Sequence, residues 1–155
     1  MLTGKVGIRE GTESFSANLL WRQQAEGFRM DLWGPLGQGR VEIVNKGSQI
    51  QLRNGQGLIT EGDPDQVMRE QLGWTLPLTV LPSWVQGQPL ADVQVSAARL
   101  DEAGRLAAFE QLGWSVALDR YEAVTGAAGE RQLPTRITAT RAETRVRVVV
   151  ADWQL

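Results

Sequence analysis

The chain has 155 residues, of which 42% are hydrophobic and 22% charged, with a formal net charge of −2, six tryptophans, and neither cysteine nor histidine. This length suits one domain with a hydrophobic core, the charge provides no basic field for nucleic acid, and no run of about 18 apolar residues could cross a bilayer as a helix. Because thiolate nucleophiles, the commonest general base and the commonest transition-metal ligand are missing, we expect a binding protein and not an enzyme, with no cofactor and no metal.

The first sixty residues predict an antiparallel meander of six strands. Apolar and polar residues alternate within each segment, and the short connections contain glycine, as hairpins require. The predicted strands are 3–10, 14–23, 27–33, 39–45, 48–53 and 57–60. In the third of them Phe28, Met30 and Leu32 share one face while Arg29 and Asp31 share the other, so one face of a curved sheet is expected to be dry.

A short helix is predicted after the meander, over 64–72. The stretch DPDQ at 63–66 supplies an N-cap, a proline at the first helical position, an acid in the first turn and a glutamine at the capping-box position. The alternating acids Glu61, Asp63 and Asp65 also resemble part of a calcium loop, but they lack its central glycine and its final glutamate. Helix capping explains each of these residues, so we favour it over a metal site.

A lid and five more strands are predicted in the second half of the chain. The segment WTLPLTVLPSWVQGQPL at 74–90 is apolar on more than one side, and its prolines permit only short helical turns. Strands resume at 93–100, 105–111, 114–120, 135–140 and 144–153, which makes eleven, and a flexible loop is predicted at Gly126–Gly129. The tetrapeptide QLGW occurs twice, but its flanks differ, so we do not infer a duplication.

Five arginines lie between residues 131 and 150, accompanied by a single acid, Glu143. They are Arg131, Arg136, Arg141, Arg145 and Arg147. A solvated sheet face is the simplest interpretation of this run, and a docking surface for an acidic partner is the alternative.

The connection WGPLGQGR at 33–40 places an apolar residue where a hairpin normally carries a polar one. Its proline and glycines suit a type I turn, so Leu36 is expected to point away from the strands. It could fold back onto its own sheet or form an exposed contact with a membrane or a protein. Trp33 lies beside the turn on the polar side of its strand, which is typical of an interfacial anchor. The glycines do not open a helix, so no phosphate loop is expected.

Several motifs in a fixed order resemble the LolB family, the outer-membrane lipoprotein receptors and insertases of Gram-negative bacteria. They are FSANLLW with FRMDLWGPLGQGR, GWTLPLTVLPSWVQG, DEAGRL, FEQLGWSVALDRY, LPTRI and VRVVVADW. The resemblance covers nearly the whole chain. Its most specific part is the Pro-Leu-Gly tip followed by the Gly-Trp, Leu-Pro and Trp-x-x-Gly run.

The resemblance implies a mainly β fold with an α lid, namely an incomplete, half-open antiparallel barrel of about eleven strands around a hydrophobic cavity, in one domain over 1–155. It implies that the protein accepts lipoproteins from the periplasmic carrier LolA, holds their acyl chains, and inserts them into the inner leaflet of the outer membrane without nucleotide hydrolysis. By motif match Leu36 is the loop leucine that serves insertion, and we expect Pro35 and Trp33 to share its membrane contact. We expect a monomer at the periplasmic face of the outer membrane.

Strand phase and lid position select the residues expected to wall the cavity. These are Leu19, Trp21, Phe28, Met30, Leu32, Ile43, Trp84, Trp114 and Val148. Periodicity alone does not distinguish a filled core from a ligand cavity, and the apolar lid favours the cavity.

Two features depart from the family pattern. Family members carry a lipobox cysteine and usually an N-terminal helix, whereas this chain has no cysteine and begins almost directly at the first predicted strand. We expect either that an N-terminal segment is absent from this chain or that the protein works without an anchor. Two rival functions stay open: a passive binding protein that retains a lipid or another hydrophobic ligand, and a structural adaptor with a filled core.

Overall fold

Antiparallel strands make up most of the chain in the computed structural model, which describes residues 1–34 and 39–155. The strands are β1 Leu2–Glu10, β2 Glu13–Gln24, β3 Gly27–Trp33, β4 Val41–Lys46, β5 Gln49–Asn54, β6 Gly57–Gly62, β7 Ser96–Leu100, β8 Leu106–Gln111, β9 Trp114–Asp119, β10 Glu122–Gly126, β11 Gly129–Leu133, β12 Arg136–Arg141 and β13 Thr144–Trp153. The helices are α1 Pro64–Leu72 and α2 Leu81–Trp84. Neither helix of this described part has the length and apolar character that a membrane-spanning helix needs.

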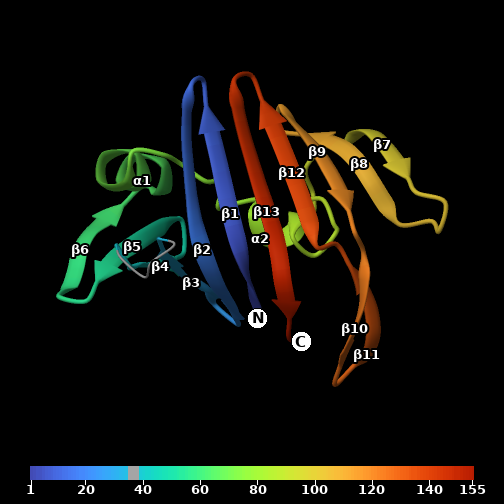
Figure 1. Cartoon of the computed structure of the whole chain (residues 1–155), viewed down its shortest axis with the longest axis horizontal. Coiled ribbons are helices and arrows are strands. Elements are labelled where there is room, and N and C mark those ends of the chain that lie inside the picture. The colour runs from blue at the N-terminus through green and yellow to red at the C-terminus, as the bar shows by residue number, and fades with distance from the viewer. Residues whose placement is uncertain (35–38) are drawn as a thin grey trace.

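Within the described residues, eleven strands form one sheet in the order β6-β5-β4-β3-β2-β1-β13-β12-β9-β8-β7. The last strand, β13, pairs antiparallel with the first, β1, from Leu2 opposite Trp153 to Glu10 opposite Thr144. This pairing joins the two halves of the chain at the centre of the sheet (Figure 1). The sheet is open, with β6 and β7 as its edges. The predicted fold class, a mainly β chain with an unclosed antiparallel sheet and short helices, is therefore confirmed.

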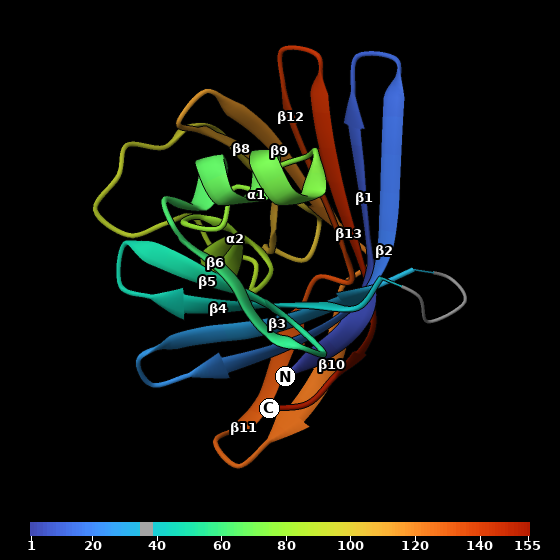
Figure 2. The same cartoon turned by 90° about the vertical axis from the view of Figure 1, so that its left-hand side faces the viewer.

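The sheet is strongly curved, and both helices lie on its concave side (Figure 2). Alternate residues of the strands point to this side because successive side chains of a strand face opposite ways. Together with apolar residues of α1 and of segment 74–85, they form one hydrophobic cluster. The core of the molecule therefore lies between the concave face and the segment that covers it.

Helix α1 begins and ends as its sequence predicts. The Asp63 side chain accepts a hydrogen bond from the Gln66 backbone N–H at 3.2 Å, Pro64 occupies the first turn, and Gly73 ends the helix with φ 81°. The Gln66 side chain differs from the capping-box expectation, because it donates to Glu70 at 3.1 Å one turn later. Of the three acids, Asp63 caps the helix, Asp65 lies in its first turn, and Glu61 lies in β6, where it accepts from Gln51 Nε2 at 2.9 Å. No cluster of metal-ligand side chains occurs among the described residues.

Two predictions about the second half need correction. The predicted flexible loop at Gly126–Gly129 is the tight end of a hairpin, in which β10 pairs with β11 from Glu122 opposite Leu133 to Gly126 opposite Gly129. The strand predicted at 93–100 begins only at Ser96. It starts late because the Val93 carbonyl accepts a hydrogen bond from the Gln111 side chain at 3.3 Å, which replaces a ladder partner.

Candidate functional site

The concave face is an apolar surface assembled from strands far apart in the sequence. All nine residues predicted as cavity walls belong to its single cluster, and each is at most 4% exposed: Leu19, Trp21, Phe28, Met30, Leu32, Ile43, Trp84, Trp114 and Val148. Eight of them lie on strands of the concave face, and Trp84 lies on the segment that covers it. Whether that face opens into a cavity stays a prediction, since in this structure the covering segment packs directly against it.

Register explains why these side chains meet. Trp21 lies opposite Met30, and Met30 lies opposite Ile43, so three neighbouring strands place apolar groups in one row. The Trp21 and Phe28 rings approach to 5.4 Å between centroids, the spacing of an attractive aromatic pair. The same alternation on β13 and β12 sets Val148 opposite Ile137, which continues the apolar face across the sheet.

The lid segment inserts one large ring into this surface. Trp84, at the end of α2, has no measurable exposure. Its ring meets Phe109 edge-on at 5.9 Å and Trp114 at 6.2 Å between centroids. Its Nε1 donates to Gln111 Oε1 at 3.0 Å, so the indole is held by both packing and a buried hydrogen bond.

The Gln111 side chain attaches the lid to strand β8. Its Oε1 also accepts from the Leu90 backbone N–H at 2.9 Å, and its Nε2 donates to the Leu90 carbonyl at 2.9 Å. The side chain is 2% exposed, so these bonds satisfy it fully. Sequence reasoning missed this residue. The only available signal was a glutamine in phase with the buried positions of β8, inside the second QLGW tetrapeptide.

Small pockets open where the lid meets the sheet. One of about 140 Å³ lies near the chain termini and is lined mainly by apolar side chains, including Leu2, Trp21, Pro82 and Val85. A second of about 250 Å³ lies beside the β2–β3 hairpin and shares Pro82 with the first. A larger pocket of about 510 Å³ at β8–β9 has mainly polar surroundings. The apolar core is therefore reached most directly past Pro82 of the lid.

The predicted membrane contact lies partly outside the described residues. Pro35 and Leu36 fall in the stretch 35–38, outside the part of the chain that the structure describes. Trp33 is half-buried at the end of β3, and the Arg40 guanidinium carbon lies 5.4 Å from its ring centroid. Nearby, the Asn18 side-chain amide donates to the Gly34 carbonyl at 3.3 Å, which fixes the point where the connection leaves β3.

Strand phase places Asp31 on the polar side with Trp33, yet this carboxylate is 6% exposed. It is shielded by two arginines, since Arg22 Nη1 lies 3.4 Å and Arg40 Nη2 3.7 Å from its oxygens. The outer side of β3 is therefore a charged cluster at the root of the 34–40 connection, and not a simple solvated face.

The five arginines between 131 and 150 do not form one surface. Arg131 belongs to the separate β10–β11 hairpin, Arg136 pairs with Asp119, and the Arg141 guanidinium carbon lies 4.4 Å from the Trp114 ring centroid. The other two, Arg145 and Arg147, remain on the outer side of β13. The expectation of one solvated sheet face therefore holds for Arg136, Arg145 and Arg147, which alternate with buried residues of β12 and β13, and not for Arg131 and Arg141.

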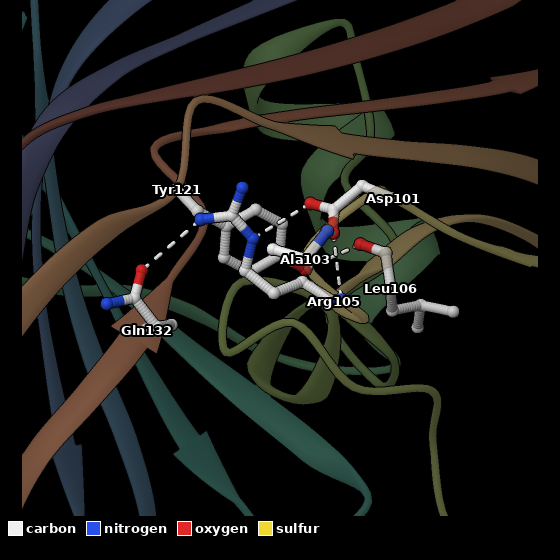
Figure 3. A network of polar contacts seen from close by, with 6 residues as sticks. All are labelled: Asp101, Ala103, Arg105, Leu106, Tyr121 and Gln132. Atoms are coloured by element: carbon white, nitrogen blue, oxygen red, sulfur yellow. Dashed lines mark hydrogen bonds and ion pairs between the residues drawn. The ribbon is translucent and has the colours of Figure 1, made fainter.

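A polar network at the DEAGRL turn docks the β10–β11 hairpin onto the sheet (Figure 3). Asp101 accepts from the backbone N–H groups of Ala103 and Arg105 at 2.9 Å each, and from Arg105 Nε at 2.8 Å. The Arg105 guanidinium lies over the Tyr121 ring at 4.8 Å and donates to Gln132 at 3.3 Å.

Hydrogen bonds to the Arg105 backbone and side chain hold the pKa of Asp101 below its ordinary value, while burial raises the pKa of Tyr121. The roles of these groups are structural.

Comparison with known proteins finds one family over almost the entire chain. A family model described as "Outer membrane lipoprotein LolB" matches residues 1–153. A protein named outer-membrane lipoprotein LolB from Cellvibrio japonicus is 32% identical over 155 residues, covering 99% of this chain and 76% of the relative. One of the same name from Pseudomonas aeruginosa is 36% identical over 154 residues, covering 99% and 73%. Another, from Halorhodospira halophila, is 33% identical over 153 residues, covering 98% and 73%.

Proposed function

This chain belongs to the LolB family of outer-membrane lipoproteins, and from that membership we propose that it accepts lipoproteins from the periplasmic carrier LolA and inserts them into the outer membrane. The observation that supports this most is the apolar concave face covered by one proline-interrupted segment. A surface of this kind suits acyl chains, which need apolar contact and few polar partners. We propose that the protein acts as a monomer at the periplasmic face of that membrane.

Loading requires the lid to move. The apolar pocket beside Pro82 has about 140 Å³, below the range of about 300 to 1,000 Å³ of typical ligand pockets, so it is too small for a long acyl chain. An incoming chain displaces Trp84 and the neighbouring lid residues from the concave face and takes their place. Each buried methylene contributes about 0.8 kcal/mol, so a chain of a dozen carbons compensates for the lost lid contacts.

We assign the release of lipoprotein into the bilayer to the 34–40 connection. A single exposed leucine contributes about 1.5 to 3 kcal/mol when it enters an apolar phase, which supports reversible contact and not stable anchoring. Leu36 is therefore suited to touch the bilayer and leave it again, with Pro35 and Trp33 beside it. No external energy is needed if carrier, concave face and bilayer hold the acyl chains with successively greater affinity.

The test is a transfer assay with fluorescent lipoprotein loaded on LolA, this protein and vesicles. We expect Leu36→Glu to take lipoprotein from the carrier and to leave it uninserted, because a charged tip does not enter the interface. The matched control is Leu58→Glu, which alters a leucine that is 54% exposed on edge strand β6 and should insert normally. Normal insertion by Leu36→Glu would refute the loop's role.

The same assay separates the rival functions. A passive binding protein would take up lipoprotein and keep it even with an unaltered Leu36, and a structural adaptor would leave the lipoprotein on the carrier. Insertion by the unaltered protein, without added nucleotide, distinguishes the proposed function from both.

A further inference from the structure

The convex face of the sheet carries a group of cations that the proposed function does not use. Lys5 and Arg9 on β1 and Arg145 and Arg147 on β13 alternate with buried residues of the core, so they point away from the helices. We call these four residues the basic face. None of them forms a salt bridge within the described residues, in contrast to Arg136, which pairs with Asp119.

Register places hydroxyl groups on both sides of these cations. Across β2, β1, β13 and β12, one row is Ser14, Arg9, Arg145 and Thr140, and the next is Ser16, Gly7, Arg147 and Thr138. Directly opposed side chains in such rows have Cβ atoms about 4.5 to 5.5 Å apart. Neighbouring members of each row therefore place guanidinium and hydroxyl donors within reach of one small anion.

Gly7 leaves a hollow in the middle of this surface. A Cβ at Gly7 would meet no atom within 4 Å. A pocket of about 180 Å³ there is lined by Arg9, Ser14, Arg145 and Arg147, together with Gly7, Ile8 and Phe15. Arg147 Nε donates to the Thr138 hydroxyl at 3.3 Å, which steadies one guanidinium at its rim. The lining of the hollow thus holds three arginines and the Ser14 hydroxyl, and no acidic residue.

The nearest acids point to the other face, are already paired, or lie at the ends of hairpins. Glu10 points to the concave side, where Arg69 Nη1 of α1 lies 3.7 Å from its carboxylate. Asp119, which lies near Arg147 across β12, is bound by Arg136 Nε at 2.7 Å. Glu13 and Glu143 are exposed at the ends of their hairpins. Within the described residues, none of these acids forms a salt bridge with the basic face.

We propose that the basic face binds phosphate groups of anionic membrane lipids, with the hollow over Gly7 receiving one of them. Guanidinium groups match phosphate oxygens bidentately, and hydroxyl groups add further donors. The choice of bilayer phosphates over free phosphate rests on the proposed function, in which this protein meets a membrane.

Continuity with the 34–40 connection supports a bilayer as the partner. The outer row of β2 runs from Ser14 to Asn18, about 13 Å along the strand, and Asn18 binds the Gly34 carbonyl at the root of that connection. Figure 2 shows the end of β3 and the start of β4 on the side of the sheet away from the helices. The basic face and the root of the connection thus belong to the same side of the molecule.

A pair of substitutions at Gly7 tests the proposal with little risk to the fold. The φ angle of Gly7 lies outside the left-handed region and the space above it is open, so either side chain fits. Gly7→Glu should weaken binding to vesicles of phosphatidylcholine with phosphatidylglycerol by about fivefold or more, as expected for one charge at an anionic surface. Gly7→Ala, the matched control, should keep its affinity within about twofold. Binding is measured by co-sedimentation, with folding checked by circular dichroism.

A second variant removes two of the cations. Arg145→Gln with Arg147→Gln should lower binding to the same vesicles about 30-fold, whereas Arg99→Gln with Arg131→Gln, which alters two exposed arginines elsewhere, should have little effect. Equal losses in both double variants would overturn the proposal, since only net charge would matter. Unchanged vesicle binding with a weakened LolA complex would also overturn it and identify a protein-docking surface.

Two further measurements distinguish bilayer phosphate from free phosphate and vesicle binding from lipoprotein insertion. Saturable binding of inorganic phosphate at the Gly7 row, combined with vesicle affinity that Gly7→Glu leaves unchanged, would indicate a free-phosphate site and contradict a lipid partner. The vesicle assay uses no lipoprotein, and the Gly7→Glu effect should persist in a Leu36→Glu background. Failure of lipoprotein insertion with intact vesicle binding would therefore count against the proposed function alone.

Discussion

The Gln111 side chain is a single buried amide on which the attachment of the lid depends. Its two polar atoms bind the Trp84 indole and the backbone of Leu90 and Val93. An apolar side chain of similar size could fill the space, but it would leave the buried Trp84 indole N–H and the half-buried backbone groups of Leu90 and Val93 without these partners. Packing of its apolar side chains holds the lid against the concave face, and Gln111 determines where on β8 the lid is attached.

We therefore expect Gln111→Leu to destabilise the protein by about 2 to 4 kcal/mol, because one buried and several half-buried groups lose hydrogen bonds, and a buried group left unpaired costs about 1 to 3 kcal/mol. Urea unfolding measures the change. Gln24→Leu, at an exposed position of β2, is the matched control and should stay within about 0.5 kcal/mol of the parent. An equally small effect at Gln111 would show that the lid is held by packing alone.

At the scale of elements, the lid is less firmly built than the sheet it covers. Helix α2 is a single turn of four residues whose N-cap makes no side-chain hydrogen bond, whereas β1 and β13 pair along their whole length. Short elements held by side-chain packing open locally at lower free energy than central strands. The lid is thus the element most suited to yield to an acyl chain.

Hydrogen exchange tests this difference. The backbone N–H groups of Trp84 and Val85, which donate to Val80 and Leu81, should exchange at least about tenfold faster than that of Val148 on β13. Exchange of the lid and of β13 at the same rate would mean that the lid leaves only by global unfolding. Loading by lid movement would then be untenable.

The elements also show which structural features can be predicted from local sequence patterns. Alternation in β3 and capping around α1 were predicted correctly because both are local. The β10–β11 hairpin was missed because most of its residues are exposed, with Leu133 its one buried position, so it has no apolar stripe to detect. It is held instead by Arg105 and Gln132, a contact between residues 27 positions apart that periodicity cannot predict.

At the scale of the whole molecule, the open sheet gives its two faces different chemistry. The concave face is apolar and covered, and the convex face carries the basic face and the root of the 34–40 connection. Strand alternation predicted which residues share a side. The rows of the basic face could not be predicted in this way. They depend on the pairing of β1 with β13, which joins the two ends of the chain and has no local sequence signal. The central claim is that acyl chains lie under the lid and then pass to the bilayer.

The most direct measurement of that claim uses lipoprotein with photoreactive acyl chains, presented on LolA and mapped by mass spectrometry of the cross-linked protein. Before vesicles are added, cross-links are expected on the concave face, at Trp21, Phe28 and Trp84, and they should disappear once vesicles receive the cargo. Cross-links on outward-facing positions such as Leu58 and Val149, or cross-links on the concave face that persist after vesicles are added, would contradict the account.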